Sequence, residues 1–246
     1  MPEAWLPVAL AFLAGGLVKG AVGLGLPTVV LAGLAPYMPI SQAAAILVIP
    51  SLVTNVWQLF GGPWPARSAW RLAPLLLGLV VGTLLAPVGM ATVNTHVAAL
   101  CLGGSLVAYA AVGLANRTPS LPAGAERWAS PVLGLACGVI NAATGLFVVP
   151  LVPYVQSLGM VKDELVQALA LCFTAGALAL ALRLGMDGTS VLAELRGSVL
   201  ALVAALLGMP VGKALRDRSS QQVFRNCLFA VLLAVGAGLI AKGLLA

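Results

Sequence analysis

Long apolar stretches limit what this chain can fold into more than any other feature. Eight apolar segments follow one another, separated by short connections that hold charges, glycine or proline: 4–35, 41–60, 69–90, 94–115, 130–156, 164–184, 190–212 and 220–245. Each reaches the roughly 20 residues that an α-helix needs to cross the hydrocarbon core of a bilayer. Only helices and closed barrels satisfy their backbone groups in lipid.

The pattern within the segments favours helices over barrel strands. Stretches such as 72–85 and 199–207 are apolar on every face, whereas the strands of a barrel alternate polar and apolar side chains. Hydrophobic residues make up 61% of the 246 and charged residues only 8%, against roughly 25% charged residues in a soluble domain. We therefore predict an all-α polytopic membrane protein. No basic cluster precedes Trp5, so the first helix is expected to be retained rather than cleaved as a signal peptide.

Two of the segments contain residues that interrupt helices. A single helix over 4–35 would be about 48 Å long, well beyond the ~30 Å hydrocarbon core. Glycine and proline weaken or break helices, and both segments hold several such residues, among them Gly15, Gly16, Gly20, Gly23, Gly25 and Pro27 in the first and Gly134, Gly138, Gly145, Pro150 and Pro153 in the second. Each segment is expected to form two short half-helices around an irregular centre.

The interrupted segments fall at matching points of an internal duplication. Matching residues keep their order at an offset of 118 early in the halves and 125 to 126 later: Gly16, Leu17 and Gly20 with Gly134, Leu135 and Gly138; Gln42 with Gln167; Gly82 with Gly208; Cys101 with Cys227. The duplication predicts a first membrane repeat over 1–118 and a second over 119–246.

The distribution of basic residues distinguishes two arrangements of the interrupted segments. If each crosses the membrane once, the basic residues other than Lys19 divide about evenly between the two sides. If each is a re-entrant hairpin, one side holds Arg67, Arg71, Arg117, Arg127, Lys162, Lys213, Arg216, Arg218 and Arg225, against Arg183, Arg196 and Lys242 on the other. The hairpin arrangement makes the halves inverted repeats, each with one broken or re-entrant helix plus three transmembrane helices. Inverted repeats with discontinuous helices are typical of secondary transporters that bind substrate at the midplane.

Lys19 is the only charged residue in the middle of an apolar segment. A lysine at depth costs about 2.5–3.5 kcal/mol on insertion scales. This cost is explained if Lys19 faces a wet cavity and attracts an anion, or if its long side chain reaches the membrane surface. No acidic residue lies deep in an apolar segment, so a carboxylate proton relay has no candidate.

Backbone amides exposed at the breaks, and nearby polar side chains, complete the predicted anion site. Its candidate residues are Lys19, Gly20, Gly23, Gly25, Asn141, Thr144, Gly145, Ser51, Asn55 and Thr174. Two alternatives stay open: the glycines could instead allow helices to pack closely, and the polar side chains could instead form hydrogen bonds between helices.

Two related glycine-rich motifs give the chain a family resemblance. Gly16 to Val30 reads GLVKGAVGLGLPTVV, and Gly134 to Pro150 reads GLACGVINAATGLFVVP. With its two similar halves, the chain resembles the sulfite exporter TauE/SafE family over nearly its whole length. The resemblance implies export of sulfite or organosulfonates such as sulfoacetate through the bacterial inner membrane. The second motif lacks the usual glycine run, so Asn141 and Thr144 are expected to supply donors there.

These observations together predict a secondary transporter of small sulfur-containing anions, and not an enzyme, because no nucleophile with a base and no metal cluster is evident. The alternatives are an anion-selective channel and a transporter of another small organic anion. No cofactor is expected. The expected partners are the anion and the lipid bilayer, a homo-oligomer is compatible with the sequence, and nucleic acid is excluded because the basic residues are scattered. The expected location is the bacterial inner membrane, as a multi-pass protein.

Overall fold

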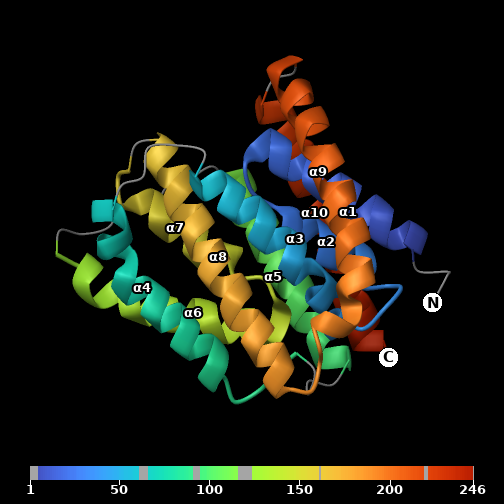
Figure 1. Ribbon diagram of the computed structural model, residues 1–246, viewed down its shortest axis with the longest axis horizontal. Coiled ribbons are helices and arrows are strands. Elements are labelled where there is room, and N and C mark those ends of the chain that lie inside the picture. The colour runs from blue at the N-terminus through green and yellow to red at the C-terminus, as the bar shows by residue number, and fades with distance from the viewer. Residues whose placement is uncertain are drawn as a thin grey trace.

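The computed structural model describes residues 5–60, 66–90, 95–115, 124–160, 162–218 and 221–245, and every regular element within these ranges is helical (Figure 1). The described residues of the first half form α1 (Trp5–Val22), α2 (Leu26–Leu34), α3 (Ile40–Phe60), α4 (Ala66–Leu85) and α5 (Thr95–Ala115). Those of the second half form α6 (Glu126–Thr144), α7 (Val148–Ser157), α8 (Lys162–Met186), the short 3-10 helix η2 (Leu192–Glu194), α9 (Leu195–Arg218) and α10 (Gln221–Leu245). The predicted all-α architecture is confirmed.

Both predicted breaks are present, and glycines form them. Between α1 and α2, Gly23 and Gly25 adopt φ angles of 88° and 108°. Between α6 and α7, Gly145 adopts a φ of 70°. Residues with a Cβ rarely adopt this left-handed conformation, so glycine at these positions lets the chain leave one helix and start another.

Two short half-helices would place each break near the middle of its segment, but both breaks lie later than that. The first helices are long, with 18 residues in α1 and 19 in α6, whereas α2 has 9 residues and α7 has 10. Gly16 and Gly20 lie inside α1 without interrupting it. They face the backbone of α9 at Ala205 and Met209. The expectation of two short half-helices is therefore wrong for the first helix of each pair, where the early glycines serve close packing.

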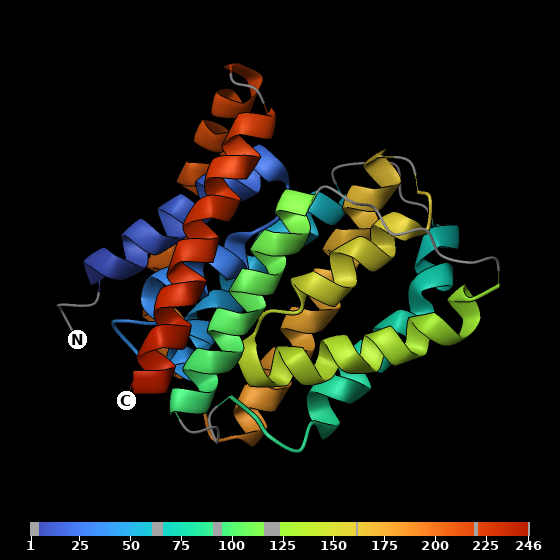
Figure 2. The same cartoon turned by 180° about the vertical axis from the view of Figure 1, so that it is seen from behind.

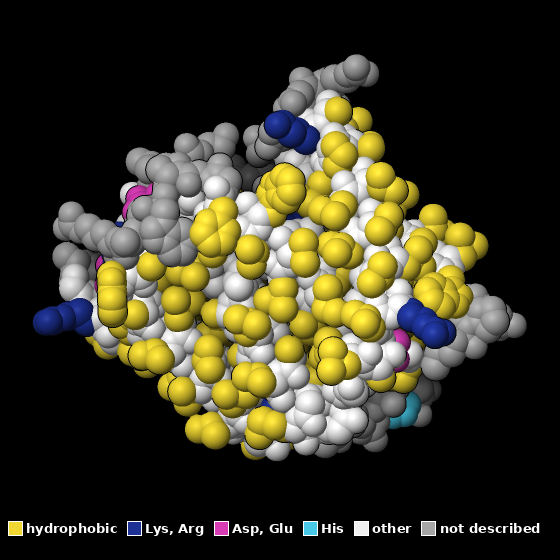
Figure 3. Space-filling model, in the orientation of Figure 1, with side chains coloured by type: hydrophobic (Ala, Val, Ile, Leu, Met, Phe, Trp, Pro, Cys, Tyr) yellow, Lys and Arg dark blue, Asp and Glu magenta, His cyan; other side chains and the backbone are white. Residues whose placement is uncertain are grey.

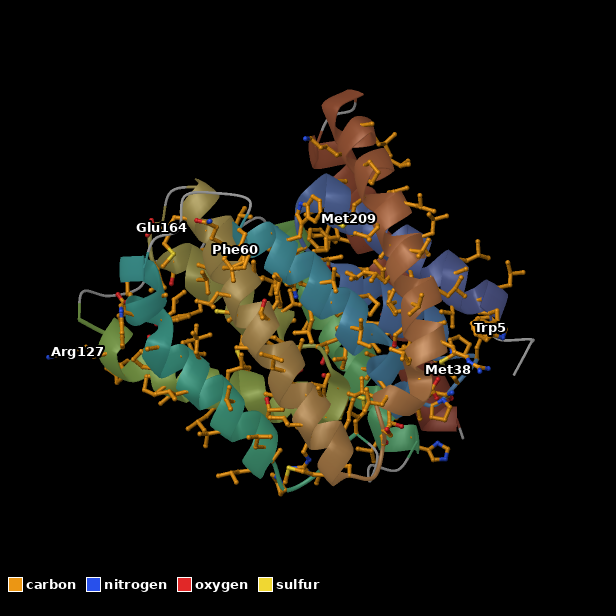
Figure 4. All side chains as sticks on the ribbon, in the orientation of Figure 1. Trp5, Met38, Phe60, Arg127, Glu164 and Met209 are labelled. Carbon is orange, nitrogen blue, oxygen red and sulfur yellow. The ribbon has the colours of Figure 1, made fainter. Side chains whose placement is uncertain are left out.

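Each broken segment folds back on itself as a hairpin. Side chains added at Gly15 and Gly33 would meet Leu26 and Ala11 respectively, so α2 runs back along α1. Trp5 at the start of the hairpin lies near Met38 just beyond its end (Figure 4), and both line one pocket of about 260 Å³ at that end of the bundle.

The second hairpin closes in the same way. The hydroxyl groups of Ser130 on α6 and Tyr154 on α7 are hydrogen-bonded to each other, which joins the start of α6 to the far part of α7. Both broken segments are therefore helical hairpins.

The two halves of the chain pack against each other rather than forming separate domains. The most extensive helix pairs are α1 with α9, α4 with α6, α5 with α10, and α3 with α8, and each pair joins one helix from either half. Figure 2 shows α5 and α10 side by side. Glycines allow the closest approaches: a Cβ at Gly208 of α9 would lie 2.3 Å from the carbonyl oxygen of Leu13, and one at Gly82 of α4 would lie 2.5 Å from that of Leu135.

The outside of the bundle is suited to lipid. Figure 3 shows apolar side chains covering the visible face, with few charged groups among the described side chains. Leu77, Leu182 and Leu207 on α4, α8 and α9 are exposed. Four of the described helical stretches are long and apolar enough to cross a membrane: Trp5–Val22, Ile40–Phe60, Glu164–Met186 and Leu192–Leu215. Apolar exposure on this scale is unusual for a soluble monomer and fits a multi-pass membrane protein, as predicted.

Candidate functional site

A small cavity of about 20 Å³ lies between the two breaks. It is bordered by the start of α2, the second break, α3 and α8, through Pro27, Ala44, Leu47, Val48, Ser51, Asn141, Gly145, Phe147, Phe173, Ala177 and Leu180. A volume of this size holds about one water molecule. Residues from both halves of the chain therefore meet at one point.

Ser51 supplies the polar wall of the cavity on α3. Its hydroxyl oxygen accepts a hydrogen bond from Nδ2 of Asn55 at 3.2 Å. No acceptor for the Ser51 hydroxyl hydrogen is found among the residues that the structure describes. A hydroxyl can donate one hydrogen bond while accepting others, so Ser51 has a donor to offer to a ligand in the cavity.

Lys19 lies directly behind this wall. It occupies the last turn of α1, is only 4% exposed, and does not reach the surface. Its Nζ donates to Thr54 Oγ1 at 3.0 Å and to Oδ1 of Asn55. The hydroxyl of Thr54 donates in turn to the carbonyl oxygen of Pro50 at 2.7 Å, so it acts as an acceptor toward Lys19. Both partners of Lys19 are neutral oxygens, and Asn55 links the Lys19 side chain to Ser51 and hence to the cavity.

Asn141 forms the polar wall on the other side. Its Nδ2 donates to Thr83 Oγ1 at 3.2 Å and to the carbonyl oxygen of Gly176 at 3.0 Å. The expected role of this amide was to donate to the substrate. In this conformation both of its N–H groups are used inside the protein, and they hold α6 against α4 and α8.

The N-termini of both short helices border the cavity. Pro27 belongs to the first turn of α2, and Phe147 precedes the first residue of α7. Neither N-terminus has a side-chain cap. The first amides of a helix lack intrahelical acceptors and carry partial positive charge, so the two N-termini favour a negative group nearby. Pro27 itself has no N–H to donate.

Six of the ten predicted site residues come together here. Ser51, Asn141 and Gly145 line the cavity. Lys19 and Asn55 lie behind Ser51, and Gly25 caps the N-terminus of α2 beside Pro27.

The other four have structural contacts away from the cavity wall. Gly20 packs on α9, where a Cβ would lie 2.0 Å from the carbonyl oxygen of Met209. The carbonyl oxygen of Gly23 accepts from Nε2 of Gln58 at 2.8 Å. The Thr144 hydroxyl donates to the carbonyl oxygen of Ile140 at 2.8 Å and accepts from the Leu146 amide at 3.1 Å, which fixes the second break. Thr174 donates to the carbonyl oxygen of Ala170 at 2.7 Å.

Sequence reasoning missed four residues of this region. Thr83 anchors Asn141, and its signal was available: it is a lone hydroxyl in an otherwise apolar stretch. Phe147 and Phe173 form an aromatic pair with ring centroids 5.5 Å apart beside the cavity. A side chain at Gly176 would overlap the Phe147 ring. Nothing in the sequence distinguishes these phenylalanines from ordinary core residues.

The described residues include no group of three or more His, Cys, Asp or Glu side chains able to hold a metal ion. The polar groups around the cavity instead include donors, namely a hydroxyl, an ammonium behind it and two helix N-termini, beside the acceptor Oδ1 of Asn141. This set of groups is suited to binding an oxyanion.

The family model described as "Sulfite exporter TauE/SafE" matches residues 8–239. No curated protein and no solved structure matches the chain.

Proposed function

Because the chain belongs to the sulfite exporter TauE/SafE family, it is a membrane transporter of sulfur-containing anions, and we propose that it is a secondary transporter that exports them. Its substrates are small anions such as sulfite or organosulfonates, of which sulfoacetate is one. As a transporter it moves its substrate chemically unchanged. It lies in the bacterial inner membrane, and it binds the anion between the two broken helices near the midplane.

One observation carries this proposal: the small cavity between the breaks has a free hydroxyl donor at Ser51, and the buried Lys19 lies behind it. An ammonium has three hydrogen-bond donors, and two of those on Lys19 are held by neutral oxygens. The positive charge is therefore uncompensated within the described part of the protein. A substrate anion that enters the cavity supplies the missing negative charge.

The packing of the helices supports the proposal that the halves are inverted repeats. Each half has a hairpin followed by three helices. If α1 corresponds to α6 and α4 to α9, the pair α1 with α9 becomes the pair α6 with α4, and both pairs are among the most extensive in the bundle. Exchange of the halves likewise leaves α3 with α8 and α5 with α10 unchanged. A pseudo-twofold axis through the cavity accounts for these relations.

Contacts at the ends of the bundle agree with the uneven distribution of basic residues. Arg71 of α4 pairs with Glu126 at the start of α6, with Arg71 Nε 2.6 Å from the carboxylate. Both lie at the end that is expected to hold nine of the twelve basic residues. By the positive-inside rule we assign this end to the cytoplasm.

The small cavity favours a carrier over the alternative of a channel. A volume of about 20 Å³ is smaller than any sulfonate, so binding requires the surrounding helices to move apart. A site that must widen to admit its substrate is expected of alternating access, whereas an open pore needs no such movement. Counterflow separates the two: proteoliposomes loaded with unlabelled substrate should transiently accumulate labelled substrate through a carrier and should not do so through a channel.

Replacement of Lys19 tests the site directly. Lys19→Met removes the buried charge while keeping an unbranched side chain, and removal of an unpaired buried charge is not expected to unfold the protein. Thermal stabilisation by sulfite and ethanesulfonate, which reports on occupancy, should be lost in this variant. Lys213→Met is the matched control, because Lys213 is an exposed lysine on α9. The proposed site is refuted if both variants respond to the anions as the wild type does.

A further inference from the structure

The hydrogen bonds around Lys19 fit a neutral amine better than an ammonium. Its Nζ donates to Thr54 Oγ1 at 3.0 Å and to Oδ1 of Asn55, and it has no other hydrogen bond within the described part of the chain. An ammonium has three N–H donors, so one of them would lack an acceptor here. A neutral amine has two N–H groups, and both are paired in this arrangement. The two partners therefore fit Lys19 after it has given up one proton.

Burial acts in the same direction. Lys19 is only 4% exposed, and the cavity beyond Asn55 and Ser51 has a volume of about 20 Å³, room for about one water molecule. An isolated charge in such surroundings is so costly that a buried group commonly becomes neutral instead. The closed site thus disfavours the charged form of Lys19 as long as no anion is present.

No described side chain beside Lys19 offsets this cost. Lys19 is the only ionisable residue of α1, and both α2, which packs on α1, and α3, which holds Thr54 and Asn55, have none. The helix α9 faces α1 with Ala205, Met209 and Gly212. Its ionisable residues are exposed or belong to its last turn: Arg196, Lys213, Arg216, Asp217 and Arg218. The helix α10 also touches α1, and the side chains of its ionisable residues lie outside the described ones: Arg225, Cys227 and Lys242.

We propose that Lys19 is a neutral amine while the site is empty and takes up a proton when the anion binds, so that the protein transports its anion together with one proton. This inference rests on the proposed function and names the coupling ion. When the helices move apart on one side of the membrane, the anion enters with water, and Nζ of Lys19 gains a proton from this water. On the other side the anion leaves, and Nζ returns the proton to water.

The net charge that crosses the membrane is then zero. The anion contributes one negative charge and the proton on Lys19 contributes one positive charge, so the loaded site is neutral and the empty site is neutral as well. The gradients of the anion and of protons, and not the membrane potential, set the direction of transport. Export follows an outward gradient of the anion.

Proton uptake on binding tests this inference directly. Ethanesulfonate is the probe, because a sulfonate stays an anion at neutral and alkaline pH and brings no proton of its own. The purified full-length protein is titrated with it in weakly buffered solution containing a pH indicator, between about pH 7 and pH 9, where an ordinary lysine is almost fully protonated. We expect uptake to approach one proton per bound anion as the pH rises. Apparent affinity should fall by up to about tenfold per pH unit, since proton and anion binding are linked.

Lys19→Arg is the matched variant, because a guanidinium keeps its proton in proteins. It should bind ethanesulfonate without proton uptake and with an affinity that does not change over this pH range. Lys213→Met, at an exposed lysine, is the control and should take up protons as the wild type does. The wild-type measurement decides the question even if the larger arginine side chain is not accommodated.

Transport gives an independent measurement. In proteoliposomes that contain a pH-sensitive dye, inward flux of ethanesulfonate should acidify the lumen, and a potential imposed with potassium and valinomycin should not change the rate. An anion that binds without proton uptake, or whose flux follows the imposed potential, overturns the inference and leaves the proposed function standing. If neither sulfite nor ethanesulfonate binds or is transported, the proposed function itself fails.

Discussion

Asn55 is the residue whose replacement tests the polar network most sharply. It accepts a hydrogen bond from Lys19 through Oδ1 and donates one to Ser51 through Nδ2. Asn55→Leu keeps a side chain of similar volume and removes both bonds. Lys19 is left with Thr54 as its partner among the described residues, and the charge is no longer connected to the cavity wall.

The expected loss follows from the two bonds. Hydrogen bonds between membrane helices contribute about 0.6 kcal/mol on average and up to about 1.7 kcal/mol, and those to charged groups in proteins about 1.5–3 kcal/mol. Because one of the two bonds of Asn55 involves Lys19, we expect Asn55→Leu to destabilise the protein by about 1–3 kcal/mol. Anion affinity should fall by about tenfold or more, since Ser51 and Lys19 are no longer held in their present positions.

Stability and affinity are measured on the same samples, by thermal unfolding with and without ethanesulfonate. Thr174→Val is the matched control. It removes the hydrogen bond from the part-buried Thr174 hydroxyl to the carbonyl oxygen of Ala170, but Thr174 does not line the cavity. The control should keep wild-type affinity. The proposed network would be refuted by an Asn55→Leu variant that binds the anion like the wild type, or by a Thr174→Val variant that loses binding equally.

Two further predictions concern helix packing and the bundle end. Gly208→Ala should lower stability by about 1–3 kcal/mol through overpacking, because its Cβ would lie 2.3 Å from the carbonyl oxygen of Leu13. Gly238→Ala is the control and should not lower stability, because its Cβ would meet nothing within 4 Å. Equal melting temperatures of the two variants would contradict this prediction. At the polar start of α6, the hydrogen bond from Arg71 lowers the pKa of the Glu126 carboxyl. The pair therefore stabilises the protein above the ordinary carboxyl pKa and loses this effect as the pH falls through the lowered value. Since both side chains are partly exposed, Arg71→Gln should cost under about 1 kcal/mol at pH 7 and nothing in acid, as measured by thermal unfolding at both pH values.

The breaks were predictable because their cause is local. Gly23, Gly25 and Gly145 adopt backbone conformations that other residues rarely take, and this preference is a property of the residue type. The position of Lys19 within an apolar segment was likewise visible in the sequence, although its burial was not, because its side chain could also have reached the membrane surface. Asn55 was among the predicted site residues, but its direct hydrogen bond to Lys19 was not predictable. Thr54 and Asn55 are 35 and 36 residues away from Lys19 and are brought to it only when α3 packs beside the first hairpin.

The proposed correspondence between the two halves has one offset in the sequence and another in the structure. Matching glycines gave an offset of 118 at the start of the halves, but the breaks at Gly23 and Gly145 stand 122 residues apart. The close contacts follow the larger spacing as well: Gly208 faces Gly16, and Gly82 faces Gly138. The difference is about one helical turn. Small residues recur every four positions on a helix face that packs closely. An alignment of the two halves that is shifted by four residues therefore still matches glycine with glycine, and sequence identity does not distinguish the two offsets.

The larger spacing pairs Lys19 with Asn141, and the hydrogen bonds at the breaks agree with this pairing. The carbonyl oxygen of Lys19 accepts the Gly23 amide at 2.7 Å, and that of Asn141 accepts the Gly145 amide at 2.8 Å. The two residues thus occupy the same position of their hairpins, one turn before each break. In one half this position holds a cation and in the other a neutral amide. A symmetric fold with lysine in both halves would need two negative charges to neutralise it. The difference between Lys19 and Asn141 therefore limits the positive charge of the site to one, independently of the shape that the two hairpins share.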